Sequence, residues 1–136
     1  MADLTITAAN VTPGANATID TGTAGATITA GQALYKDLTD SSKLKLADQD
    51  AAATAIAAGI SLHGAASGQP VDYIKGGTLN LVGAVTIGRI YTVSSTAGGI
   101  ASSTDVTSGK FVTTLGIGTA TSALAVKIHS SGVARV

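Results

Sequence analysis

The sequence predicts one mainly β domain, a compact β-barrel with at most one or two short helical turns. Three residue types dominate the composition, with 25 Ala, 20 Thr and 17 Gly among 136 residues. Every acidic residue is Asp and Glu is absent; Glu favours helices, whereas Asp favours turns and caps. Short runs in which apolar and polar residues alternate recur along the chain, which is the period of a half-buried strand. The length suits a single domain.

Residues 1–29 predict an extended N-terminal arm. Small and polar side chains alternate here, with Leu4 and Ile6 on one face and a turn signal at Pro13-Gly14. Because the segment has few bulky anchors, it is either an arm that a partner orders or an edge strand of the same domain. The remainder, residues 30–136, is predicted to form the β domain.

A β-hairpin is predicted at the start of this domain. Residues 34–36 precede a turn at 40–42, and residues 43–46 then alternate strictly. The Ala-rich stretch 48–58 follows, and Ala has the highest helix propensity. We expect one exposed helical turn there and then a strand that runs to about His63; a longer helix is the alternative.

Two more strands are predicted at residues 71–75 and 78–81, where β-branched and apolar residues return. Gly76-Gly77 lies between them, and two glycines at this place allow the positive φ angles of a tight hairpin turn. Gly83 is predicted to end the second of these strands.

The second half of the domain, residues 87–136, repeats the plan of residues 30–81 at an offset of about 56 residues. Both halves contain an apolar-Tyr pair, Leu34-Tyr35 and Ile90-Tyr91, followed by a Ser/Thr/Gly turn. The predicted strands are 87–93, 100–101, 111–117 and 123–128, with a turn at 130–132. Two copies are too few for a solenoid, so we interpret them as a duplicated unit inside one barrel; chance resemblance between Thr/Gly/Ala strands is the alternative.

Composition argues against several kinds of site. The chain has no Cys, which excludes disulfides, thiolate catalysis and zinc–thiolate sites. His63 and His129 each end a strand and are expected at the surface, and the Asp-x-Asp of residues 48–50 lacks the Gly and Glu of a calcium loop. We therefore expect no enzyme activity, no cofactor and no metal ion.

Charge and hydropathy bear on partners and location. Eight basic and eight acidic residues balance, which gives no electrostatic footprint for nucleic acid or an anionic membrane. The first residues lack the basic and apolar regions of a signal peptide. No apolar run approaches the ~18 residues of a membrane span.

The few large side chains are the predicted core. The chain has three Tyr and one Phe, and a core of small apolar residues buries little area at ~25 cal/mol per Å². Burial against partners would supply the rest, which favours an oligomer. The residues predicted for the core or a subunit interface are Tyr35, Leu44, Leu46, Tyr73, Ile74, Tyr91 and Ile128.

Residues 30–81 carry, in order, most of TAGQALYKD and then SSKLKLAD, AAGISL and GQPVDYIKGGTL. This order resembles the small head-decoration (cement) proteins of tailed bacteriophages, including the lambda-type protein. In that family an extended N-terminal arm precedes a compact, mostly β domain. The C-terminal half departs from the lambda-type pattern, because it repeats β units where that protein has a more helix-containing end. A related β-tulip-like arrangement is therefore also open.

The resemblance implies a structural virion protein that is assembled in the host cytoplasm and binds the outer surface of an icosahedral head as a homotrimer. Its work would be to cement neighbouring major capsid subunits against internal DNA pressure. Its partners would be the major capsid protein and itself, with no nucleic acid and no membrane. An extended arm can add a strand to a partner's sheet, and Leu4, Ile6 and Val11 are the predicted contacts of the arm with the shell.

Two other classes of function stay open. One is a binding module that recognises a glycan or a protein, such as a phage fibre domain or a bacterial surface or adhesin domain. The other is a small hydrolase, which would need His63 or His129 beside an Asp and a Ser in a cleft.

Overall fold

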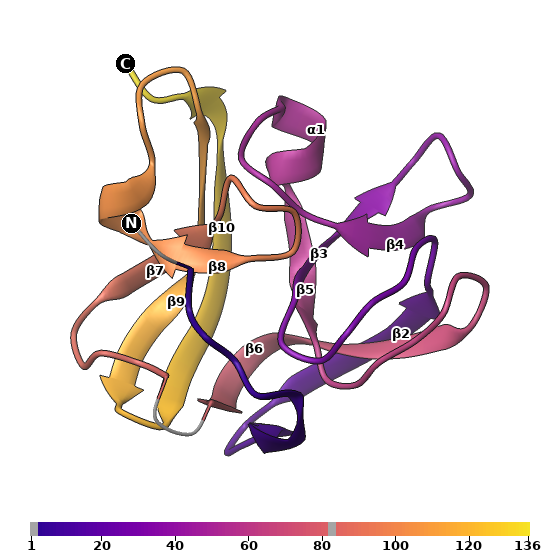
Figure 1. Ribbon diagram of the computed structural model, residues 1–136, viewed down its shortest axis with the longest axis horizontal. Coiled ribbons are helices and arrows are strands. Elements are labelled where there is room, and N and C mark those ends of the chain that lie inside the picture. Colours follow the sequence, from indigo (N-terminus) through magenta and orange to yellow (C-terminus); the bar gives the residue numbers. More distant parts are fainter. Residues whose placement is uncertain (1–2, 82–83) are drawn as a thin grey trace.

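Ten strands form one sheet that curls into a half-barrel in the computed structural model, which describes residues 3–81 and 84–136 (Figure 1). Strands make up 51 % of the chain and helices 8 %, which confirms the mainly β prediction. The elements are η1 (Ala8–Asn10), β1 (Val11–Pro13), β2 (Thr18–Thr23), β3 (Ala33–Asp37), β4 (Lys43–Leu46), α1 (Ala52–Ala55), β5 (Ala57–Ser61), β6 (Pro70–Leu81), β7 (Ile90–Val93), β8 (Ile100–Ser102), η2 (Ser103–Asp105), β9 (Phe111–Ala120) and β10 (Ala123–Ala134).

The internal repetition is visible in the sheet order, β4-β3-β5-β6-β10-β9-β7-β8. Read outward from the β6–β10 pair, each half contributes a long strand, a second strand and a hairpin in the same order. A β-bulge also lies at the same place in both units, directly after the pair Leu34–Gly59 and directly after the pair Tyr91–Gly116. The register therefore matches Tyr91 with Leu34, whereas the sequence alignment matched it with Tyr35. Leu34 and Tyr91 are both buried. The two units therefore correspond by which residues point into the core, and not by residue type.

Strand β6 is shared by the two units. Its first half pairs with β5 and its second half with β10, so the predicted hairpin turn at Gly76-Gly77 is wrong. Gly77 does take a positive φ of 87°, and a Cβ on it would collide with the backbone of Asn16. Because this residue is a glycine, the N-terminal segment can pass close to a strand that continues without a turn.

The predicted turn at residues 130–132 is also wrong, because β10 continues to Ala134. Gly132 has a φ of +73° inside that strand, and the pairing of β10 with β9 shifts register between Ser130 and Ala134. The glycine therefore lies in an irregular part of a ladder, where its positive φ is tolerated without ending the strand.

The N-terminal segment lies along the other edge of β6. Strands β1 and β2 both pair antiparallel with it, so Val11–Pro13 and Thr18–Thr23 are edge strands of the same sheet, as in the second of the two alternatives. At the end of β2, a parallel bridge joins Ala24 to Leu44 of β4, and the Gly25 N–H donates to the Leu44 carbonyl at 2.8 Å. Residues 1–2 of the predicted arm, and Gly83, lie outside the described residues.

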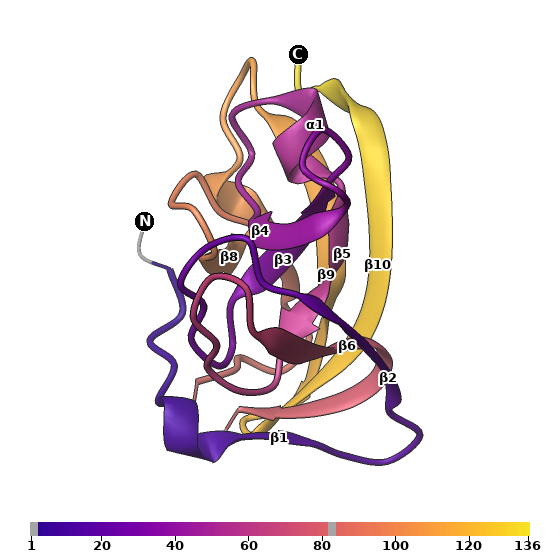
Figure 2. The same ribbon diagram turned by 90° about the vertical axis from the view of Figure 1, so that its right-hand side faces the viewer.

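Helix α1 is one turn, as the shorter alternative for residues 48–58 predicts. The side chain of Asp48 holds the segment around this helix in place. Its Oδ1 accepts hydrogen bonds from the Asp50 N–H at 3.0 Å and from Thr54 Oγ1 at 2.9 Å. The chain then returns to extended geometry at Ile56, and β5 follows. Helix α1 packs beside the end of β10 (Figures 1 and 2).

Two clusters of buried side chains form the core. The smaller one is surrounded by β2, β3, β4, β5 and the first half of β6, and its members are Ala24, Ile28, Leu34, Leu44, Ala65, Val71 and Tyr73. The larger one extends from the second unit to the N-terminal segment, and its largest members include Ile60, Ile74, Leu79, Leu81, Tyr91, Leu115 and Leu124.

Candidate functional site

The side chains predicted for the core or an interface separate into two groups. Leu44, Tyr73, Ile74 and Tyr91 are at most 2 % exposed within this one chain. Tyr35, Leu46 and Ile128 are half-buried and pack against the core clusters. The fully buried group therefore belongs to the chain's own core.

The three residues predicted as arm contacts also face the chain's own core. Val11 is 5 % exposed, and Leu4 and Ile6 pack half-buried against the larger cluster. The Leu4 N–H donates to the carbonyl of Ile100 at 2.7 Å, and a Cβ on Gly31 would lie 2.7 Å from Ile6 Cγ2. These side chains anchor the N-terminal segment, and their contact with a shell stays a prediction.

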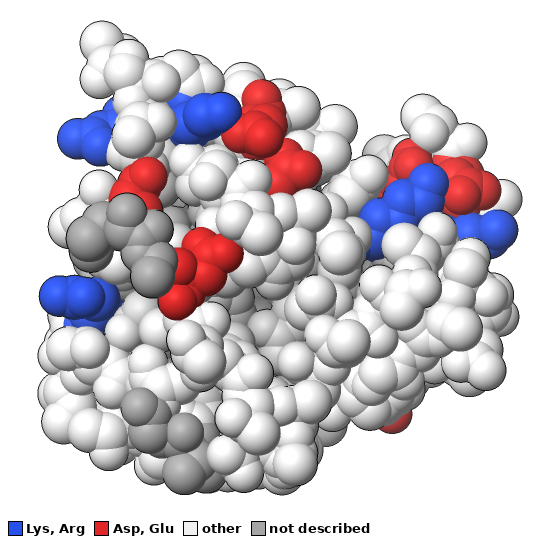
Figure 3. Space-filling model, viewed as in Figure 1, with Lys and Arg blue, Asp and Glu red and all other residues white. Residues whose placement is uncertain are grey.

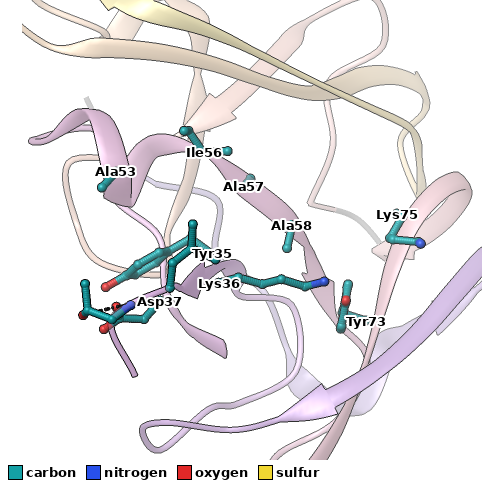
Figure 4. Close-up of a pocket in the computed structure, with 11 residues that line it drawn as sticks. Tyr35, Lys36, Asp37, Ala53, Ile56, Ala57, Ala58, Tyr73 and Lys75 are labelled. Carbon is teal, nitrogen blue, oxygen red and sulfur yellow. Dashed lines mark hydrogen bonds between the residues drawn. The ribbon is translucent and has the colours of Figure 1, made fainter. Parts of the chain in front are cut away.

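An apolar groove of about 580 Å³ opens between the turn after β3, helix α1, β5 and β6 (Figure 4). We call it the tyrosine groove. Small side chains of β5, Ala57 and Ala58, line it together with Tyr35 and Tyr73. Leu38, 80 % exposed, and Ile56, 55 % exposed, add large apolar surface that no described residue covers.

Sequence reasoning missed this groove. Leu38 stands between Asp37 and Thr39 in a polar turn, and Ile56 is the one large apolar residue in an Ala-rich run. Each departs from its local pattern, which was the available signal. Their proximity depends on how β3 and β5 pair, which neither local pattern contains.

Most charges around the groove are compensated. Lys45 Nζ lies 2.7 Å from Asp37 Oδ2, and Thr39 Oγ1 donates to Asp37 Oδ1 at 2.6 Å. The Lys45 hydrogen bond is the main reason that the pKa of Asp37 falls to about 2. Lys75 Nζ lies 3.3 Å from Asp20 Oδ2. Among the described residues, these carboxylates therefore already have cationic partners.

Asp20 and Tyr73 continue this network. The Thr21 N–H donates to Asp20 Oδ1 at 2.8 Å, and this hydrogen bond, followed by Lys75, lowers the pKa of Asp20. The Tyr73 hydroxyl donates to Asp20 Oδ2 at 3.4 Å. Burial is the main cause that raises the pKa of Tyr73, so its hydroxyl stays protonated.

Lys36 is the exception. Its side chain lines the groove and, in Figure 4, extends along it toward Tyr73. In the described part of the chain, no ion pair joins Lys36 to a carboxylate. The groove thus combines an apolar surface with one ammonium group that forms no ion pair among the described residues. Lys36 acts on Asp20 only through space, where it contributes less than Lys75 to lowering the pKa of that carboxyl.

The pKa of Asp37 makes part of the stability depend on pH. Its folded value of about 2 lies below the reference value of 3.8, so the unfolded chain binds the proton more readily. The stabilisation is present above the reference value and is lost as pH falls through the folded one. We expect urea unfolding to show that the stability difference between wild type and Asp37→Asn shrinks between about pH 5 and pH 2. A difference that does not change with pH would contradict the assignment.

A second apolar hollow, of about 390 Å³, is lined by residues of β9 and β10. Ile117 pairs with Ile90 across β9 and β7, and the two are 46 % and 42 % exposed. Lys127 and His129 lie on the same hollow. This surface is therefore apolar and, like the tyrosine groove, carries one lysine that forms no ion pair among the described residues.

The two histidines belong to different elements, His63 to the loop after β5 and His129 to β10. His63 Nε2 accepts the Asp72 N–H at 3.0 Å, and its Nδ1 lies 2.9 Å from the carbonyl oxygen of Gly64. These two contacts hold the loop between β5 and β6 in place. His129 is exposed on β10. Within residues 3–81 and 84–136, no group of three or more His, Asp or Glu side chains could hold a metal ion.

No helix in the described part of the chain is long and apolar enough to cross a membrane. The sequence matches no model of a known protein family, and a search of curated proteins finds no similar sequence.

Proposed function

We propose that this protein is a structural virion protein that binds the outer surface of an icosahedral phage head as a homotrimer. There it would cement neighbouring major capsid subunits against internal DNA pressure, after assembly in the host cytoplasm. The observation that carries the proposal is the apolar surface left uncovered on the single chain, at Leu38 and Ile56 and again at Ile90 and Ile117. Such patches mark protein–protein contacts. The more specific proposal of a virion protein is supported by the resemblance of residues 30–81 to head-decoration proteins.

Sparse charge supports the same proposal. On the face of the molecule that Figure 3 shows, broad areas have no charged side chains, and the acidic and basic residues are gathered in a few groups. Subunit interfaces are depleted of charge at their centres. The N-terminal edge strands also suit assembly, because an edge strand offers backbone groups to which another chain can add a strand.

Purified protein mixed with expanded heads that lack it tests this function. We expect saturable binding, greater resistance of the heads to heat, and a solution mass of three times the 13.2 kDa chain. Unexpanded heads are the control, because the resemblance to head-decoration proteins implies binding only after the shell has expanded. Absence of saturable binding to heads of its own virus would defeat the proposal.

A binding module is the second candidate function. The tyrosine groove favours it, because its volume of about 580 Å³ lies in the range of ligand sites and two tyrosines line it. A monomer that binds defined sugars on a glycan array, with binding lost on Tyr35→Ala, would support this candidate over a capsid protein.

A further inference from the structure

We propose that the tyrosine groove docks a protein segment that presents a large apolar side chain next to a carboxylate. This proposal concerns the chemistry of the partner and does not depend on the partner being a capsid subunit.

The lining of the groove selects an apolar side chain. Ala57 and Ala58 leave room above β5, and the half-buried Tyr35 supplies aromatic surface beside them. Tyr73 is 1 % exposed and held by its neighbours, so this part of the wall is already formed. An apolar side chain placed here would exclude water from a surface that is ready to receive it.

The outer part of the groove selects a macromolecule over a small ligand. Small-molecule sites bury most of their ligand within their walls. Here Leu38 is 80 % exposed and Ile56 55 % exposed, so a ligand confined to the groove would leave much of their surface in water. A protein segment can insert one side chain and cover Leu38 and Ile56 with its backbone and its neighbouring residues.

The charge selects an acidic segment. Asp37 is held by Lys45 at 2.7 Å and Asp20 by Lys75 at 3.3 Å, whereas Lys36 has no such partner among the described residues. A carboxylate on the segment would pair with Lys36 beside apolar surface, where the attraction exceeds that in bulk water. A basic segment would bring like charge to the same place.

The same reasoning disfavours a second copy that uses its other apolar face. That face carries Lys127 and His129 beside Ile117. Docking it on the groove would bring Lys127 toward Lys36, and the lining of that face holds no carboxylate that could pair with Lys36. Like charges brought together oppose association. An acidic, apolar segment of another protein is the occupant that the charges favour.

Selection of random peptides on the full-length protein tests the proposal, with the enriched peptides then synthesised and titrated by fluorescence anisotropy. We expect enriched sequences that place Leu, Ile, Phe or Trp beside Asp or Glu. Ile56→Glu should weaken their binding by more than about tenfold, and Lys36→Glu by about tenfold. If Ile56→Glu fails to fold, Leu38→Glu takes its place, because that side chain is 80 % exposed.

Matched controls lie outside the groove. Ile87→Glu changes another exposed Ile, and Lys127→Glu changes a lysine of the β10 face; both should bind the peptides as the wild type does. Enrichment of no peptide family, enrichment of basic peptides, or binding that survives the groove variants would overturn the proposal. So would sedimentation showing that Ile56→Glu turns a wild-type oligomer into a monomer, because the occupant would then be a second copy.

Discussion

Replacing Gly59 with Ala is expected to lower the free energy of unfolding by about 2–3 kcal/mol. A Cβ at this position would lie 2.5 Å from the carbonyl oxygen of Ile74 and 2.5 Å from Tyr73 Cδ2. The first atom belongs to the backbone of β6, and the second belongs to a tyrosine that is 1 % exposed. Neither can withdraw freely, so the added methyl must push two strands apart. Urea unfolding at neutral pH measures the loss.

Gly64→Ala is the matched control. It makes the same chemical change, but the nearest neighbour of its Cβ is the Ile28 carbonyl oxygen at 3.4 Å, an ordinary contact. We expect its stability to stay within about 0.5 kcal/mol of wild type. Gly116, which opposes Tyr91 as Gly59 opposes Leu34, should behave like Gly59. Equal losses for Gly59→Ala and Gly64→Ala would show that the close packing of β5 on β6 is not the cause.

Replacing Leu44 with Ala is expected to cost about 2–5 kcal/mol of stability. Leu44 is fully buried in the smaller core cluster, and its side chain would lie 2.7 Å from a Cβ on Gly22. Truncation leaves a cavity where β2, β4 and β6 meet, and these strands are held by backbone bonds that limit collapse into the space. Chemical denaturation again measures the effect.

Leu38→Ala is the control for Leu44→Ala, since the two substitutions remove the same atoms. Leu38 is 80 % exposed, so its truncation should change stability by less than about 0.5 kcal/mol. A large loss at Leu38 in the isolated chain would mean that the tyrosine groove is already covered in solution.

Local patterns were sufficient for much of the sheet. The strict alternation of residues 43–46 correctly predicts β4 and its hairpin with β3, because a half-buried strand requires that period. The Ala-rich segment correctly predicts a single helical turn. The repeated order of elements in the sequence has a counterpart in the sheet, where β6-β5-β3-β4 and β10-β9-β7-β8 follow outward from the β6–β10 pair.

The glycines show where local reasoning ends. Gly76-Gly77 has the composition of a tight turn, yet Gly77 uses its positive φ inside β6, where residues of the N-terminal segment pass closely. The same residue type satisfies both needs, and only the position of a segment some 60 residues away distinguishes them. The tyrosine groove was missed for a similar reason, because its exposed members come from separate elements.

The N-terminal residues show a related difficulty. Leu4, Ile6 and Val11 are apolar residues in an otherwise small and polar segment, which marks them as contacts without saying with what. The structure packs them on the chain's own core. A one-dimensional pattern cannot separate an intramolecular anchor from an intermolecular one, since both bury the same side chains.

Because β6 gives its first half to one unit and its second half to the other, neither unit has a complete set of strands by itself. Opening either one would break the ladder on which its neighbour depends, so partial unfolding is disfavoured in both. The molecule is therefore expected to melt as one cooperative whole despite its twofold plan.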